Sequence, residues 1–254
     1  MNKKQGLIIL TIATVLILAV FGEVSAQGID LSEFGINFDA ADNEPQAVVD
    51  TVRIFILLTV LTLVPSFVIL TTAFTRVVVV LSFLRNSMGT QQTPPNQVLM
   101  GLALFITLFV MQPVFSQVMD EAVTPYLEEE ITQEEAFAVG SEPIKEFMLS
   151  HTREKDLALF MRFSDTAETI EEPMDVPFTI LIPSFVISEL RMAFSIGFVL
   201  FIPFLVVDIT VASILMSMGM FMLPPVMISL PFKILLFIMV DGWYLVVESL
   251  LRTF

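Results

Sequence analysis

The sequence predicts an all-α integral membrane protein, with about four broken hydrophobic helical passages arranged as hairpins and a small helical insertion outside the membrane. Hydrophobic residues make up 56% of the 254, and the mean hydropathy of +0.85 is well above the range of soluble domains. The net charge of −15 is unevenly placed. Residues 30–50 hold six acids and no base, and residues 120–175 hold sixteen acids and four bases. The nearly neutral remainder argues against a soluble enzyme, a nucleic-acid binder and a disordered chain.

The first 26 residues have the pattern of a cleavable secretory signal. Lys3 and Lys4 form a positive start, residues 7–20 form a short apolar core, and Val24-Ser25-Ala26 is typical of a cleavage site. An uncleaved anchor helix is the alternative. Either way, we expect the acidic segment 27–50 to lie on the outer side of the membrane.

Four apolar blocks follow, and each is long enough for one helical passage, since a span needs about 20 apolar residues. The blocks cover residues 54–75, 86–119, 176–207 and 209–254. They predict a first hairpin over 51–119 and a second over 176–254, separated by the acidic segment 120–175. Prolines recur inside these blocks and predict broken helices whose freed backbone groups need protein partners. These prolines are Pro65, Pro113, Pro183, Pro203, Pro224, Pro225 and Pro231.

Orientation follows from the charge of the connections. Arg76 and Arg85 lie between the first two blocks with no acid nearby, which predicts a cytoplasmic turn. Segment 120–175 then lies on the outer side. The turn near residue 220 is cytoplasmic.

The acidic segment 120–175 has helical patterning. Thr132 and Glu135 have capping-box spacing, Gly140 is a candidate helix end, and Ser141 with Pro143 suggests a second start. Apolar residues recur at helical spacing after Thr152 and predict a face that docks on the protein. They are Leu157, Phe160, Met161 and Phe163. The acidic face is either solvated or a partner surface. The lone His151 is interpreted as a solvated surface residue.

Five charges inside the apolar blocks need explanation, since each costs about 2.5–3.5 kcal/mol at a membrane centre. They are Glu189, Arg191, Asp208, Lys233 and Asp241. Because Glu189 and Arg191 are two residues apart, and Lys233 and Asp241 eight, neither pair can neutralise itself easily within one helix. Partners must come from other helices or subunits, or the residues must face water. Inter-subunit ion pairs or a hydrated lumen, and an ion pathway within one chain, are the alternatives.

The string Met216-Ser-Met218-Gly-Met220-Phe-Met222-Leu-Pro-Pro is the third unusual feature. Alternation beside Gly and Pro favours a loop, and flexible methionines could form a deformable apolar seal if several copies surround an axis. Ordinary core packing is the alternative. The chain has no cysteine and one histidine, and it carries no nucleotide-binding, zinc-protease or serine-hydrolase motif. We therefore expect no catalytic site, cofactor or metal.

Several long strings resemble the flagellar biosynthetic protein FliP family. They are FTRVVVVLSFLRN at 74–86, GTQQTPPNQVL at 89–99, PSFVISELRMAFSIGF at 183–198, LPFK at 230–233 and VDGW at 240–243. The resemblance extends from Gln46 to the C-terminus.

This resemblance implies a pore-forming, non-enzymatic subunit of the bacterial flagellar type III protein export gate. It implies a homopentamer that assembles with FliQ and FliR, with FlhB, FlhA and FliO as further partners, and unfolded flagellar proteins as the cargo. It also implies that much of the assembly rises above the inner membrane, and that Met216, Met218, Met220 and Met222 form the pore gasket.

Two other functions remain open from the residues alone. A proton- or ion-coupled transporter would use Glu189, Asp208 and Asp241 as a relay. A membrane chaperone or receptor would use the acidic outer segment.

Overall fold

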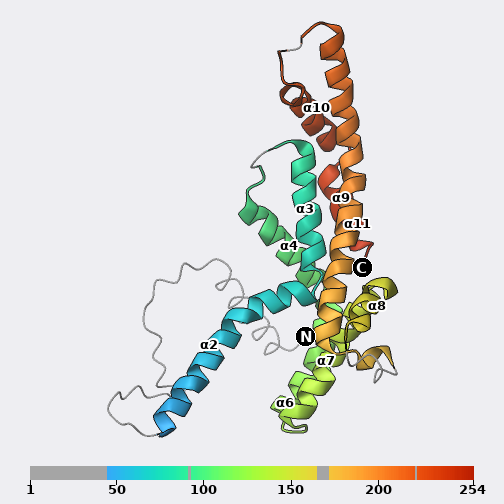
Figure 1. The fold of residues 1–254 in the computed structure, drawn as a ribbon. Coiled ribbons are helices and arrows are strands. Elements are labelled where there is room, and N and C mark those ends of the chain that lie inside the picture. The colour runs from blue at the N-terminus through green and yellow to red at the C-terminus, as the bar shows by residue number, and fades with distance from the viewer. Residues whose placement is uncertain (1–44, 91–92, 165–171, 221) are drawn as a thin grey trace. The chain divides into compact units, whose positions relative to one another are not determined.

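A computed structural model describes residues 45–90, 93–164, 172–220 and 222–254, and within these ranges the chain is helical with no strand (Figure 1). The predicted signal peptide and most of segment 27–50 lie outside the described residues. The elements are α2 (Pro45–Thr71), α3 (Phe74–Met88), α4 (Asn96–Val110), α5 (Gln112–Val118), the π-helix η2 (Met119–Val123), α6 (Thr124–Leu127), α7 (Gln133–Ser150), α8 (Glu154–Arg162), the 3₁₀-helix η4 (Pro173–Asp175), α9 (Phe178–Ser217), α10 (Pro225–Met239) and α11 (Gly242–Leu251).

The chain divides into two compact units, residues 1–62 and 63–254. The described part of the first unit is the beginning of α2, where most apolar side chains from Val52 onward are exposed. The second unit holds the other helices and both hydrophobic cores.

The described helices include two to four candidate membrane spans. Val52–Thr71 and Phe178–Ser217 are each long and apolar enough to cross a bilayer. Two more spans result if α4 is joined to the helices ending at Leu127, and α10 to α11, with bends of 57° and 64°. The prediction of an all-α membrane protein with broken passages is confirmed.

The prolines do not set most of these breaks. Pro183 and Pro203 lie inside the continuous helix α9, so the expectation that each would break its helix is wrong. Packing of the α9 face against α3 keeps the helix intact despite the two lost backbone donors. One sharp bend comes at Asp241, whose φ of 52° is left-handed, before Gly242. A Cβ on Gly242 would lie 2.2 Å from the Phe237 ring, so only glycine permits this close approach.

The predicted cytoplasmic turn at Arg76 and Arg85 is a helix instead. Both residues belong to α3, which ends at Gly89 with φ 76° and a backbone N–H that donates to Asn86. One face of α3 is fully buried against α9, and its apolar residues dominate the first core. The buried α3 residues are Phe74, Val77, Val80, Leu81, Leu84 and Met88. Arg76 is buried on this helix and therefore cannot report the orientation of a solvent loop.

In the outer segment, the capping box of Thr132 and Glu135 is confirmed, and it lowers the pKa of the Glu135 carboxyl through the Thr132 backbone N–H and hydroxyl. Helix α7 nevertheless continues through Gly140 and Pro143 to Ser150, so the predicted division there is wrong. Gly140 serves close packing instead, because a Cβ there would lie 3.0 Å from Ala122.

The outer helices α7 and α8 dock on the first half of α9 around a second core. Leu157, Phe160 and Met161 pack against this core as predicted, whereas Phe163 is exposed and does not. The buried members of this second core are Ala73, Met111, Val114, Phe147, Met148, Val176, Ile180, Leu181 and Phe185. The first core joins α3, α4, α9, α10 and α11.

Candidate functional site

Helix α9 connects the features that the sequence singled out. Its 40 residues correspond to about 60 Å of helix, twice the roughly 30 Å hydrocarbon thickness of a bilayer. Along it lie Glu189, Asp208 and finally Met216, in the last turn of the helix. A helix of this length must pass beyond the hydrocarbon layer or be strongly tilted within it.

Arg76 and Glu189 form a buried ion pair between α3 and α9. The Arg76 Nε donates to Glu189 Oε2 at 2.8 Å, and its Nη2 donates to Oε1, which makes the contact bidentate. The side chains are 2% and 0% exposed. Arg76 Nη1 also donates to the backbone oxygen of Thr253 at 2.8 Å and to its hydroxyl at 3.0 Å. This arrangement satisfies the charge of Glu189 completely within the chain.

Asp208 and Lys233 form a second pair, between α9 and α10. Lys233 Nζ lies 2.6 Å from Asp208 Oδ2 and donates to the backbone oxygen of Ser87 at 3.2 Å. The Ser229 hydroxyl donates to Asp208 Oδ1 at 2.5 Å. Lys233 is buried, whereas the Asp208 side chain is 26% exposed. The network holds α3, α9 and α10 together and leaves one edge of the carboxylate open.

The expectation that the intramembrane charges find partners on other helices therefore holds for three of the five. Their partners lie in the same chain, so inter-subunit pairing is not needed for Glu189, Asp208 or Lys233. Arg191 and Asp241 are exposed on the described chain and have no ion pair within it.

A third polar cluster ties α8 to α9. The Ser188 hydroxyl donates to Asp156 Oδ2 at 2.6 Å and accepts the Arg153 backbone N–H at 3.1 Å. Arg153 also pairs with Asp156. Burial raises the pKa of the Asp156 carboxyl, but the hydrogen bonds from Ser188 and Arg153 outweigh it and leave that pKa below its usual value. The outer segment thus docks through a carboxylate that stays ionised.

His151 is not the solvated residue that the sequence suggested. Its ring lies 4.5 Å from the Phe147 ring and 5.5 Å from the Phe254 ring, and its Nδ1 is 2.8 Å from the Phe147 carbonyl oxygen. Burial lowers the pKa of His151 in this apolar site, and nearby Arg76 acts in the same direction. The ring is therefore a neutral packing element at pH 7.

The methionine-rich turn is partly helical. Met216 lies in the last turn of α9, while Met218, Met220 and Met222 follow the end of the helix, with Gly219 at φ 77°. All four side chains are exposed, and Met222 is 96% exposed. Four flexible apolar side chains are thus presented at one end of α9 with nothing in the described chain covering them.

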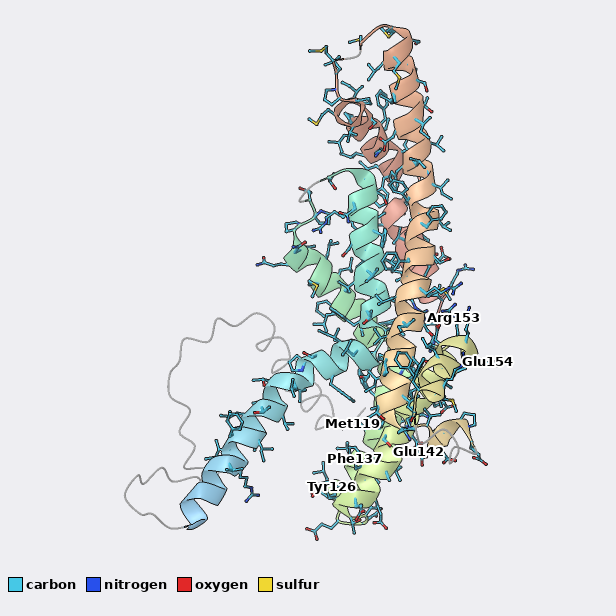
Figure 2. All side chains as sticks on the ribbon, in the orientation of Figure 1. Met119, Tyr126, Phe137, Glu142, Arg153 and Glu154 are labelled. Atoms are coloured by element: carbon cyan, nitrogen blue, oxygen red, sulfur yellow. The ribbon has the colours of Figure 1, made fainter. Side chains whose placement is uncertain are left out.

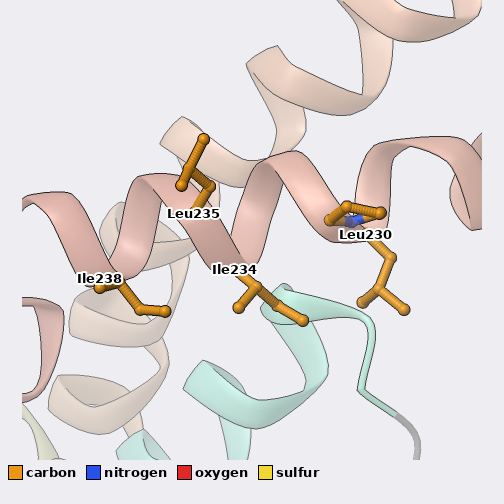
Figure 3. A pocket seen from close by; sticks show the side chains of 5 residues that line it. Leu230, Ile234, Leu235 and Ile238 are labelled. Carbon is orange, nitrogen blue, oxygen red and sulfur yellow. The ribbon is translucent and has the colours of Figure 1, made fainter.

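Exposed apolar surface extends well beyond this turn. On α10, an open apolar hollow of about 370 Å³ is lined by Leu230, Pro231, Ile234, Leu235 and Ile238 (Figure 3). It contains no polar side chain to orient a small molecule. On the outer helices, Tyr126 and Phe137 are exposed near the tip formed by α6 and α7 (Figure 2). Such surface is suited to lipid or to neighbouring protein subunits.

Sequence reasoning missed the partners that complete these clusters. Asp156, Thr253 and Phe254 belong to no motif identified in the sequence, and Ser188 appears only within the string at 183–198. The fold brings all four to the charged side chains that they contact. Among the described residues no cluster of three or more His, Asp or Glu could hold a metal ion. The site is therefore a set of ion pairs and an apolar turn.

Comparisons with known proteins agree with the strings in the sequence. The FliP family model matches residues 57–250. The flagellar biosynthetic protein FliP of Bacillus subtilis strain 168 is 56% identical over 226 residues, which cover 88% of this chain and 100% of that protein. The FliP protein of Pectobacterium carotovorum is 51% identical over 220 residues, covering 87% and 85%. That of Aquifex aeolicus strain VF5 is 51% identical over 207 residues, covering 81% and 87%.

Proposed function

Because the chain belongs to the FliP family, we propose that it is a pore-forming subunit of the flagellar type III protein export gate. Its membership and its apolar helices make it a membrane-embedded component of flagellar biosynthesis and export. The finer proposal is that several copies surround an axis through which unfolded flagellar proteins pass. The turn 216–222 is the seal of that pore.

The observation that carries this proposal is the position of the four methionines. Met216 lies in the last turn of a 40-residue helix, and the other three follow that helix before α10 begins; all four are exposed. Unbranched thioether side chains adapt to an irregular or changing surface. In a ring of such turns, the methionine side chains would fill the pore axis when no cargo is present. During export they would pack around the polypeptide.

The uncovered apolar surface supports an assembly. The hollow on α10 and the exposed faces of α9 need covering by lipid or protein. We propose a homopentamer with FliQ and FliR, in contact with FlhB, FlhA and FliO, as the family resemblance implies. Arg191 and Asp241, unpaired within the described chain, are candidates for contacts between subunits.

The proposed location is the bacterial inner membrane, with segment 120–175 in the periplasm. Support comes from the acidic charge of that segment. The basic residue Arg85 in the last turn of α3 is also typical of the cytoplasmic side. The length of α9 suits an assembly that extends beyond the bilayer.

The two best-placed acids of an ion relay are engaged elsewhere, which weighs against the transporter alternative. Glu189 is held by the Nε and Nη2 edge of the Arg76 guanidinium, and Asp208 by Lys233 and Ser229. A carboxylate fixed by a permanent cation is a poor carrier of protons. We propose that these acids hold helices together and that the subunit performs no enzymatic reaction.

Replacing the four turn methionines with alanine tests the proposed seal. We expect the variant to assemble with its partner subunits but to leak small ions through the closed gate, because four methyl side chains cannot fill the axis. The measurement is ion conductance of membranes that contain the complex.

A matched control replaces Met174, Met192 and Met239, which are exposed outside the turn. This control should assemble and remain tight. An assembled complex of the turn variant with the conductance of the parent would contradict the seal. Full motility of a strain lacking the gene would contradict the export role itself.

A further inference from the structure

The last two residues dock between α3 and α7. The guanidinium carbon of Arg76 lies 3.9 Å from the centroid of the Phe254 ring. The same ring stacks on Phe147 at 6.4 Å and 19° between planes, with His151 at 5.5 Å. Thr253 accepts two hydrogen bonds from Arg76. The residues after α11 are therefore held by a cation, an aromatic stack and two hydrogen bonds.

One face of helix α11 packs on the first core. Val246 and Leu250 are buried there and Val247 and Leu251 pack against it, while Tyr244 and Leu245 are exposed. The contacts of Thr253 and Phe254 add a polar and aromatic attachment to α3 just beyond the end of the helix. Arg76 has donors left for this role because Glu189 occupies only its Nε and Nη2.

The same bent pair of helices is held a second time on α10. Lys233 joins α10 to Asp208 on α9 and to the Ser87 carbonyl on α3. Between the two attachments lies the bend at Asp241 and Gly242, where the Phe237 ring packs against the glycine too closely for any side chain. Such a packed bend transmits displacement from one arm to the other instead of absorbing it.

The methionine-rich turn leads directly into α10, so its position depends on both attachments. We propose that Thr253 and Phe254 form a positioning anchor that sets the bent pair α10–α11 and, through it, the turn 216–222. Release of the Phe254 ring lets the pair pivot about Lys233 and moves the turn. This inference rests on the proposed function, in which that turn closes the pore.

The absence of cysteine from the chain permits a clean test. Met222→Cys places one thiol at the most exposed methionine of the turn, and its labelling rate by a membrane-impermeant maleimide in the assembled complex reports whether the turn is closed. Adding Phe254→Ala should raise the labelling rate by about tenfold, the effect expected from losing a desolvated cation–π contact. Phe254→Tyr, which keeps the ring, should restore the parental rate.

Two further variants separate an anchor from a general folding defect. Phe137→Ala removes an exposed phenylalanine of α7 and should leave labelling unchanged. Phe254→Leu keeps an apolar group but loses the ring, and should give an assembled complex with raised labelling. Parental labelling in Phe254→Ala and Phe254→Leu would overturn the anchor, and so would failure of both variants to assemble.

The outcome also distinguishes the anchor from the seal. If the four-methionine variant leaks but Phe254→Ala neither leaks nor labels faster, the seal stands and the anchor is wrong. If the four-methionine variant stays tight, the seal is wrong. Faster labelling in Phe254→Ala would then show a positioning role for Phe254 at a turn that does not close a pore.

Discussion

The two ion pairs on α9 have the same charges but different surroundings. Arg76 and Glu189 are 2% and 0% exposed, and both hydrogen bonds to Glu189 come from the one planar guanidinium. In the other pair Lys233 is 4% exposed, but Asp208 is 26% exposed and shares its charge with the Ser229 hydroxyl. The first pair is enclosed by protein, whereas the carboxylate of the second pair is partly exposed.

This difference teaches that burial, and not the charge pair itself, decides what a broken pair costs. Removing one member of a sealed pair leaves a charge with neither water nor a counter-ion. Removing one member of an open pair leaves a charge that water and remaining hydrogen bonds can stabilise. The first pair is thus a structural joint, and the second tolerates change in the region that carries the methionine-rich turn.

The largest effect is expected from breaking the sealed pair. Glu189→Met leaves the Arg76 guanidinium buried without its carboxylate, and should destabilise the subunit by about 3–5 kcal/mol. The melting temperature of the detergent-solubilised subunit, followed by helical circular dichroism, measures the loss. The destabilised subunit should also give less assembled complex than the parent.

A double variant sharpens this expectation. In Arg76→Met with Glu189→Met, both charges are replaced by apolar groups of similar size, so most of the lost stability should return. Recovery should be incomplete, because Thr253 loses both of its hydrogen bonds from Arg76. A double variant no more stable than Glu189→Met would contradict the idea that an unpaired buried charge causes the damage.

A smaller effect is expected at the open pair. Lys233→Met removes the buried cation and leaves Asp208, whose side chain is 26% exposed and keeps the hydrogen bond from the Ser229 hydroxyl. The loss should be about 1–2 kcal/mol, and the complex should still assemble. The same melting experiment measures it. A loss as large as that of Glu189→Met would mean that Asp208 is as sealed in the assembly as Glu189 is in the chain.

Local patterns predicted the elements of this fold better than their partners. The apolar blocks and the capping box at Thr132 depend on neighbouring residues, and both are found. The pairing of Arg76 with Glu189 spans 113 residues, so no local rule could find it. Arg76 was instead interpreted as a marker of the cytoplasmic side, since a positive charge between apolar blocks usually lies in a solvent-exposed loop.

Proline and glycine failed as local signals for a related reason. Pro183 and Pro203 sit in α9 because packing on α3 stabilises the helix more than two lost backbone bonds weaken it. Gly140 lies within α7 because Ala122 packs so closely against it that a Cβ there would lie only 3.0 Å away. In both cases tertiary contacts, which the sequence does not display, overrode the local preference. The anchoring of Phe254 was invisible for the same reason.

The exposed pair Glu248–Arg252 provides the lower end of the comparison. The two residues are one helical turn apart on α11, Arg252 Nη2 donates to Glu248 Oε1 at 2.7 Å, and the Arg252 side chain is 78% exposed. If burial sets the cost, Arg252→Ala should change stability by about 0.5 kcal/mol or less, because water replaces the lost contact and such pairs are worth little. The melting temperature should therefore stay close to that of the parent, and lower salt should widen the gap only slightly. A loss comparable to that of Lys233→Met would place this face of α11 inside a subunit contact, where the pair is desolvated by a neighbour.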